Sequence, residues 1–171
     1  MQRIAIIGCC GAGKSTLSNQ LGLKLNLPVI HLDAYYWHPG WSETSTTEWI
    51  TKQQSLIKKE RWILDGNYLQ TMDIRLQAAD TIILLDFPRI LCLWRVVRRY
   101  LRYRGTVRSD MADGCVERLN GDFLLYVWNF AHSQRRSILS KIRPYQSYKQ
   151  VMIFHHPQQV NSFLSQLDYL R

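Results

Sequence analysis

Apolar residues in this chain follow two alternating patterns. Short continuous apolar runs predict buried strands at residues 3–7, 29–32, 62–66, 81–85 and 150–154. Between these runs, apolar residues recur every three or four positions, which predicts helices at residues 14–25, 46–59, 89–103, 122–142 and 158–170. Strands that alternate with helices are typical of βαβ units, so we expect an α/β domain built on a parallel sheet.

The 171 residues are expected to form a single domain, because this length is sufficient for one hydrophobic core. A segment rich in Gly, Asp and Ser, residues 105–121, separates the helices predicted at 89–103 and 122–142. We expect this segment to be mobile, since such a composition is typical of loops.

The sequence GCCGAGKST, residues 8–16, lies between the first predicted strand and the first predicted helix. It fits the pattern G-x-x-x-x-G-K-[ST], in which glycines let backbone N–H groups surround a phosphate and the following helix adds its positive N-terminal dipole. Lys14 would reach the outer phosphates, and the Ser15 hydroxyl would hold Mg2+. The residues expected to bind the nucleotide are Gly8, Gly11, Ala12, Gly13, Lys14, Ser15 and Thr16.

Three carboxylates, Asp33, Asp65 and Asp86, lie at the ends of predicted strands. Ligands of open α/β sheets gather at the carboxyl ends of the strands, so each carboxylate is a candidate partner for Mg2+. The pattern alone leaves the three open, because it does not contain the order of the strands in the sheet.

The chain is basic, with 22 Lys and Arg residues against 13 Asp and Glu residues and a formal net charge of +9. This charge favours an anionic partner, which a nucleotide and a nucleic acid satisfy equally. The sequence contains no apolar run of about 18 residues or more, so we expect neither a signal peptide nor a membrane span. We therefore expect a cytoplasmic protein without a membrane partner.

The four cysteines, Cys9, Cys10, Cys92 and Cys115, have neither the spacing of a metal site nor that of a disulfide framework. We expect reduced thiols. Cys9 and Cys10 lie in the glycine-rich loop, either as small residues that fit there or as thiols whose oxidation would block the entry of a nucleotide.

Longer blocks of the sequence resemble a known family. The blocks are GCCGAGKST, LPVIHLDAYYWHPGW, RWILDGNY, ADTIILLDFPR, CLWRVVRRYLRYRG, DMADGCVERL and FLLYVWNF. Over nearly the whole chain they resemble the bacterial DNA topology modulation proteins (FlaR-related), which belong to the adenylate-kinase-like P-loop kinases. The resemblance implies a three-layer P-loop NTPase fold with a five-stranded parallel sheet in the order 2-3-1-4-5. It also implies ATP with Mg2+ and a helical lid that carries arginines, here at about residues 95–136 of one kinase-like domain.

The implied strand order would place the third strand beside the first and so bring Asp65 next to the glycine-rich loop. We therefore expect Asp65, together with Ser15, to serve the Mg2+ site; the alternative is a turn residue before Gly66. Asp86 resembles the strand end from which the lid helix starts in such kinases, and we interpret it as structural.

Asp33 resembles the acid that follows the second strand in P-loop kinases that phosphorylate a hydroxyl group, where the pattern is D-x-[FY]-Y. Such an acid can accept the proton of the alcohol; the alternative is a helix or turn cap. Arg75, by contrast, would grip an anionic acceptor. These two residues favour different acceptors, and the choice between a hydroxyl and a phosphate stays open.

The acceptor is predicted to contact Asp33, Tyr36, Asn67 and Arg75. The aromatic loop AYYWHPGW, residues 34–41, lies close to Asp33 in the sequence. Its rings either stack on a planar base or a sugar, or form a small satellite core.

The helix predicted at residues 89–103 has two distinct arcs. Ile90, Trp94, Val97 and Leu101 fall in one, and Arg95, Arg98, Arg99 and Arg102 fall in the adjacent one. We expect the apolar arc to pack and the basic arc to face a ligand. Arginines of a closing lid stabilise the charge on a transferred phosphoryl group. We expect Arg98, Arg99 and Arg102 to do this, with Arg135 or Arg136 from the next helix.

These features together predict an ATP-dependent phosphotransferase that moves the γ-phosphate to a nucleoside, a nucleotide or another small acceptor. Its catalytic residues would be Lys14, Asp33, Arg98, Arg99, Arg102 and Arg135. The alternative is a nucleotide-dependent regulator that binds DNA or a protein and transfers nothing, since a basic helix with interleaved tyrosines can also follow a phosphate backbone.

Overall fold

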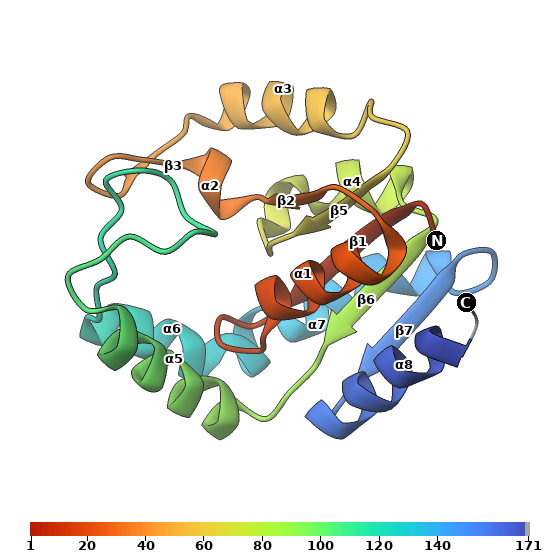
Figure 1. Ribbon diagram of the computed structural model, residues 1–171. Coiled ribbons are helices and arrows are strands. Elements are labelled where there is room, and N and C mark those ends of the chain that lie inside the picture. Colours follow the sequence, from red (N-terminus) through yellow and green to blue (C-terminus); the bar gives the residue numbers. More distant parts are fainter. Residues whose placement is uncertain (170–171) are drawn as a thin grey trace.

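A computed structural model describes residues 1–169 of the chain, and a parallel sheet lies at its centre (Figure 1). Within these residues, five strands pair in the order β2-β5-β1-β6-β7. The strands are β1 (Arg3–Gly8), β2 (Val29–His31), β5 (Trp62–Asp65), β6 (Thr81–Leu85) and β7 (Gln150–Phe154). This order confirms the predicted 2-3-1-4-5 arrangement.

The three inner strands, β1, β5 and β6, are buried along nearly all of their length. Helices cover both faces of the sheet, which explains why these strands appear in the sequence as continuous apolar runs instead of alternating ones. The register places Ile6 between Asp65 on β5 and Ile83 on β6. The carboxyl ends of β1 and β5 therefore meet at the same edge of the sheet.

Helices form the two outer layers (Figure 1). Their bounds are α1 (Lys14–Leu25), α2 (Asp33–Tyr36), α3 (Thr46–Leu56), α4 (Met72–Ala78), α5 (Arg89–Tyr103), α6 (Gly121–Ser133), α7 (Arg135–Ile142) and α8 (Pro157–Tyr169). Two ion pairs each join two neighbouring helices. Lys24 pairs with Asp168 between α1 and α8, and Lys141 pairs with Asp73 between α4 and α7. Two short 3-10 helices, η1 (Leu69–Thr71) and η2 (Arg143–Tyr145), complete the connections.

The structure differs from the sequence prediction in four elements. The helix expected at residues 122–142 is divided at Gln134, whose φ of −119° interrupts the helical backbone between α6 and α7. The aromatic segment folds into α2 and a small antiparallel hairpin of β3 (Trp37–His38) and β4 (Ser42–Glu43), and α4 was not expected. Residue 170, the expected end of the last helix, and residue 171 of the predicted domain lie outside the described residues.

Helix α5 is oriented opposite to the expectation. Its buried side chains are Cys92 and Val96, whereas the apolar arc predicted to pack is exposed to solvent. The reason is the close approach of the glycine-rich loop. A Cβ atom at Gly11 would lie 2.3 Å from the carbonyl oxygen of Cys92, so only the small side of the helix can face the loop.

The segment between α5 and α6 forms a lid loop, residues 104–120. An antiparallel bridge between Val107 and Val116 closes it into a narrow loop. It is hydrogen-bonded to the β3–β4 hairpin, since Gly40 N–H donates to the Gly114 carbonyl (3.2 Å) and the Trp41 indole donates to the Val116 carbonyl (2.9 Å). No helix within residues 1–169 has the length and apolar character needed to cross a membrane.

Candidate functional site

The glycine-rich loop joins the carboxyl end of β1 to the N-terminus of α1. Gly13 precedes α1 in a left-handed conformation (φ 98°), and no side chain of the described residues caps this terminus. The first N–H groups of the helix therefore remain available to an anion, and the helix dipole favours negative charge there. The close contact at Gly11 leaves room only for glycine.

Two side chains from other elements fix this loop. The Asn67 Oδ1 accepts a hydrogen bond from the N–H of Gly8 (3.1 Å), and the Arg95 guanidinium donates to the carbonyl of Ala12 (3.0 Å). The Lys14 ammonium folds back over the loop and donates to the carbonyls of Gly8 and Cys9, at 3.0 and 3.2 Å. The lysine thus lies over the backbone of the loop.

Oxygen donors for a divalent cation lie at the start of α1. The Ser15 hydroxyl lies close to the carboxylate of Asp110, a residue of the lid loop. Burial alone raises the pKa of Asp110, but the charge of Arg108 and the hydrogen bond from Ser15 outweigh it and lower that pKa. Hydroxyl and carboxylate oxygens suit Mg2+, which usually keeps few protein ligands beside phosphates and water. No group of three or more His, Cys, Asp or Glu residues within positions 1–169 forms a cage of its own.

Asp65, predicted to serve the Mg2+ site, is next to the loop in the sheet but turns toward His31. It is 3% exposed, and the His31 Nδ1 lies 2.7 Å from its Oδ2. Burial lowers the pKa of His31, but the hydrogen bond and the charge of Asp65 dominate, so that pKa is raised above its ordinary value. Asp65 is thus paired with a partly buried histidine.

A cavity of about 1060 Å3 opens between the glycine-rich loop, α2, the β3–β4 hairpin and the lid loop. Lys14, Asp33, Tyr36, Asn67 and Arg99 all line it, so five of the predicted site residues meet here. The Tyr68 hydroxyl donates to the Asp33 Oδ1 (2.6 Å) and leaves the second carboxylate oxygen available to a ligand. Burial, then the charge of Asp33, raises the pKa of Tyr68, which keeps the tyrosine a proton donor at neutral pH.

Aromatic rings form one wall of this cavity. Tyr36 contacts three of them: the ring centroids of Trp37, Trp49 and Tyr68 lie 5.0, 5.1 and 4.5 Å away. Further aromatic side chains that line the cavity are Trp41, Phe123 and Tyr126. The rings of the aromatic loop therefore form part of the cavity wall. They pack against Trp49 of α3, which is buried.

Three arginines, Arg99, Arg108 and Arg118, line the cavity with Lys14, and the first two bind one buried carboxylate. The Arg99 Nε lies 2.8 Å from one oxygen of Glu117, and the Arg108 Nε lies 2.7 Å from the other. Arg108 and Glu117 were missed in the sequence, because they lie in a loop without periodicity and only the fold brings them to α5.

Comparisons with known proteins were made with both the sequence and the fold. No family model and no curated protein matches the sequence. The shikimate kinase from Acinetobacter baumannii, solved in complex with shikimate, superposes with a TM-score of 0.56 at 17% identity, over 99% of this chain and 92% of that chain. The shikimate kinase from Bacteroides thetaiotaomicron gives 0.53 at 19% identity, over 99% and 97%. A sugar kinase from Janibacter sp. HTCC2649 gives 0.54 at 14% identity, over 98% and 95%.

The chain has a P-loop kinase fold. At these identities the similarity concerns the fold, and it agrees with the observed α/β layers and the five-stranded parallel sheet. In such open α/β sheets, ligands bind at the carboxyl ends of the strands, which is where the glycine-rich loop and the cavity lie.

Three arginines predicted to be catalytic do not line the cavity of this kinase fold. Arg98 and Arg102 lie on the outer side of α5, where their guanidinium groups stack near Trp94 and Tyr103, 5.3 and 5.6 Å from the ring centroids. Arg135 binds the Asp86 carboxylate with its Nε and Nη2, at 2.8 Å each. Arg98 and Arg102 do not reach the cavity because of the orientation of α5, in which Arg95 and Arg99 point inward and Arg98 and Arg102 point to solvent.

Arg75, predicted to bind the acceptor, is fully buried and does not line the cavity. Its guanidinium donates to the backbone carbonyls of Gly66 (2.9 Å) and Asn67 and to the Gln53 side chain (3.3 Å). Burial lowers the pKa of Arg75 to about 10, so it stays charged at neutral pH. Arg75 supports the turn after β5 and does not face the cavity.

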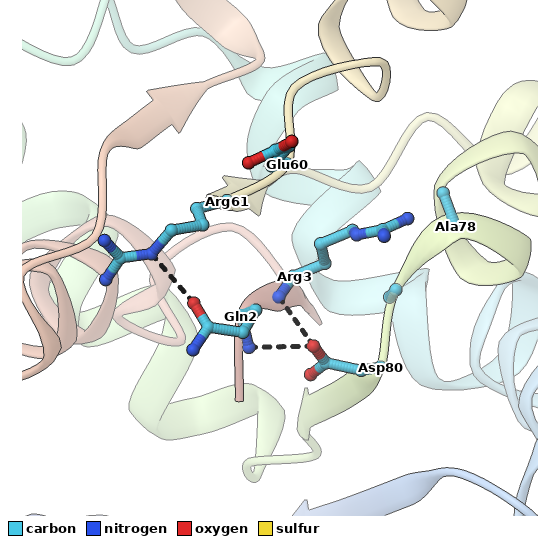
Figure 2. Close-up of a pocket in the computed structure, with 7 residues that line it drawn as sticks. Gln2, Arg3, Glu60, Arg61, Ala78 and Asp80 are labelled. Carbon is cyan, nitrogen blue, oxygen red and sulfur yellow. Dashed lines mark hydrogen bonds between the residues drawn. The ribbon is translucent and has the colours of Figure 1, made fainter.

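A second hollow, of about 850 Å3, lies at the opposite edge of the sheet (Figure 2). The Asp80 carboxylate accepts hydrogen bonds from the N–H groups of Gln2 (2.7 Å) and Arg3 (2.9 Å), and the Arg61 Nε donates to the Gln2 side chain (2.8 Å). These contacts join the start of β1 to two neighbouring loops. Because the hollow lies at the amino ends of the strands, we interpret it as structural.

The His31–Asp65 pair predicts a pH dependence of stability. A raised folded-state pKa means that the pair stabilises the fold fully below the ordinary histidine pKa of 6.5, and that this contribution is lost as the pH rises through the raised value. We expect the free energy of unfolding of wild type and His31→Gln to differ more at about pH 5.5 than at about pH 9. Urea denaturation at both pH values measures this, with the exposed His156→Gln as control; an equal difference at both would contradict the pairing.

Proposed function

We propose that this protein is an ATP-dependent kinase that transfers the γ-phosphate to a hydroxyl group of a small, ring-containing acceptor. One observation carries the proposal: the Asp33 carboxylate, oriented by Tyr68, lines the same cavity as Lys14 of the glycine-rich loop. A carboxylate in this position can accept the proton of an attacking alcohol. An acceptor that attacks through a phosphate would need no such base and would be repelled by it.

The burial of Arg75 supports the same choice. In the sequence, Arg75 was the residue that favoured an anionic acceptor, and its donors are directed to backbone carbonyls. The aromatic wall around Tyr36 favours an acceptor with a flat ring face, because aromatic side chains stack on such faces. Both observations therefore favour a hydroxyl group over a phosphate as the attacking group of the acceptor.

The side chains of the site divide the work of phosphoryl transfer. The backbone N–H groups of the loop and Lys14 would bind the phosphates of ATP. Asp33 would take the proton from the hydroxyl group that attacks. Mg2+, held by the Ser15 hydroxyl and phosphate oxygens, would neutralise charge on the phosphates. Arg99 and Arg108 would exchange part of their interaction with Glu117 for the oxygens of the transferred group.

The test is the formation of ADP from Mg-ATP with candidate acceptors added singly: nucleosides, cyclic alcohols, linear alcohols and nucleoside monophosphates. We expect stimulation by ring compounds that carry a hydroxyl group and none by linear alcohols. Stimulation that requires the phosphate of a monophosphate would contradict a hydroxyl acceptor. Turnover that depends on DNA alone would support the regulator suggested by the resemblance to the topology modulation proteins.

Glu117 is expected to position the two lid arginines. Glu117→Gln removes the charge that both guanidinium groups bind, so we expect kcat to fall by about 10- to 100-fold while KM for the acceptor changes little. Steady-state kinetics with the best acceptor of the panel measures this. The exposed Glu60→Gln is the matched control, and an unchanged kcat in Glu117→Gln would show that the arginines do not depend on Glu117.

A further inference from the structure

Helix α5 presents two faces, and the kinase site uses only one. The inner face contacts the glycine-rich loop through Cys92 and through Arg95, and it carries Arg99 into the cavity. On the outer face, Ile90, Trp94, Val97 and Leu101 are 70%, 55%, 39% and 70% exposed. This apolar stripe runs along the whole helix, and the proposed function gives it no role.

The exposed apolar surface continues onto α6, which packs against α5. Leu125 and Trp128 are 57% and 40% exposed, and the Arg89 guanidinium lies 3.9 Å from the ring centroid of Trp128. We call the six apolar residues the outer α5–α6 face: Ile90, Trp94, Val97, Leu101, Leu125 and Trp128. Within residues 1–169 they make up half of the twelve large apolar side chains that are exposed, so the surface is concentrated on two helices.

On α5 the charge along this face has one sign, while α6 adds one acid, the exposed Asp122, three residues before Leu125. Helix α5 contains no acidic residue. Arg98 and Arg102 flank the stripe, and no carboxylate of the described residues pairs with either; their contacts are with aromatic rings. An apolar stripe with a tryptophan, Trp94, and a flanking pair of arginines without carboxylate partners is typical of helices that lie in the interface of an anionic membrane.

We propose that the outer α5–α6 face docks on an anionic lipid surface, with α5 in the plane of the headgroups. The apolar stripe would enter the boundary between headgroups and acyl chains, while Arg98 and Arg102 bind lipid phosphates. A lipid surface offers hydrocarbon and negative charge together along the full helix. This peripheral contact needs no membrane span, and it does not depend on the proposed kinase activity.

Other occupants fit the face less well. A second copy packed antiparallel on this helix would bring its own Arg98 and Arg102 against the same residues, with no acid on α5 to compensate. A nucleic acid would match the arginines but would leave Ile90, Val97 and Leu101 against sugar and phosphate. Both remain defined outcomes of the test.

The experiment is sedimentation of the full chain with vesicles in the absence of nucleotide, so loss of kinase activity cannot affect it. We expect binding to phosphatidylglycerol mixed with phosphatidylcholine and none to phosphatidylcholine alone. Arg98→Gln with Arg102→Gln should weaken the partition coefficient by about 30-fold, since each arginine near an anionic surface contributes about five- to sixfold. Ile90→Ser with Leu101→Ser should weaken it by about 100-fold.

Matched controls come from surfaces outside the face. Leu23→Ser removes an apolar side chain on α1 that is 83% exposed, and Arg136→Gln with Arg143→Gln removes two exposed arginines; both should bind as wild type does. Circular dichroism checks the fold of each variant. Absence of vesicle binding, or equal binding to neutral vesicles, would overturn the proposal. A dimer that the Ile90 and Leu101 substitutions dissociate without vesicles would assign the face to a second copy, and a DNA complex lost in the arginine variant would assign it to nucleic acid.

Discussion

Replacing Lys14 with alanine is expected to remove tight ATP binding and to lower kcat/KM for ATP by about 1,000-fold. The Lys14 ammonium lies above the loop, within 3.0 Å of the Gly8 carbonyl, and is a concentrated positive charge next to the open N-terminus of α1. Arg95 cannot take its place, because its guanidinium is bound to the carbonyl of Ala12. Isothermal titration calorimetry with Mg-ATP measures the loss.

The fold of Lys14→Ala should persist, since α1 is held to the core by Leu17 and Leu21. Thermal unfolding followed by circular dichroism verifies this. The matched control is Lys59→Ala, an exposed lysine before β5, which should bind ATP as wild type does. An unchanged ATP affinity in Lys14→Ala would show that the glycine-rich loop does not form the phosphate site.

Replacing Asp33 with asparagine is expected to lower kcat by about 100- to 1,000-fold while ATP binds as in wild type. The amide can still accept the hydrogen bond from Tyr68, so the geometry is kept and the ability to accept a proton is lost. Kinetics with an acceptor from the panel and calorimetry with Mg-ATP separate the two effects. Asp113→Asn, an exposed lid residue, is the control.

The same variant also tests the alternative role of Asp33. Asp33 is the first residue of α2, where an acid also interacts favourably with the helix dipole. A role limited to this would reduce the melting temperature of Asp33→Asn and leave kcat unchanged. Tyr68→Phe, which removes the donor but keeps the carboxylate, should lower kcat by about tenfold.

Hydrogen bonds join the lid loop, which carries Arg108, to the β3–β4 hairpin on another side of the cavity. The Cys115 thiol donates to the His38 carbonyl (3.2 Å), and together with the contacts of Gly40 and Trp41 it fixes the lid loop to the acceptor wall. Glu117 then holds Arg99 and Arg108 beside Lys14.

The sequence by itself determined the strands, the glycine-rich loop and most helices. Five apolar runs predicted the strands, and the pattern from Gly8 to Ser15 predicted the loop between β1 and α1. These features are local: a buried strand needs consecutive apolar residues, and a backbone that surrounds a phosphate needs glycines at fixed spacing. The strand order was implied by the family resemblance, and the structure confirms it.

Only the tertiary structure decided which way the side chains of the site point. Periodicity showed that Ile90, Trp94, Val97 and Leu101 share one face of α5, but the close approach of Gly11 to Cys92 turned that face to solvent. The burial of Arg75 and the convergence of Arg99 and Arg108 on Glu117 likewise depend on how helices and loops pack against one another. The physical reason is that a helical repeat fixes which residues lie together, whereas the orientation of the helix depends on the shape of the surface that it packs against.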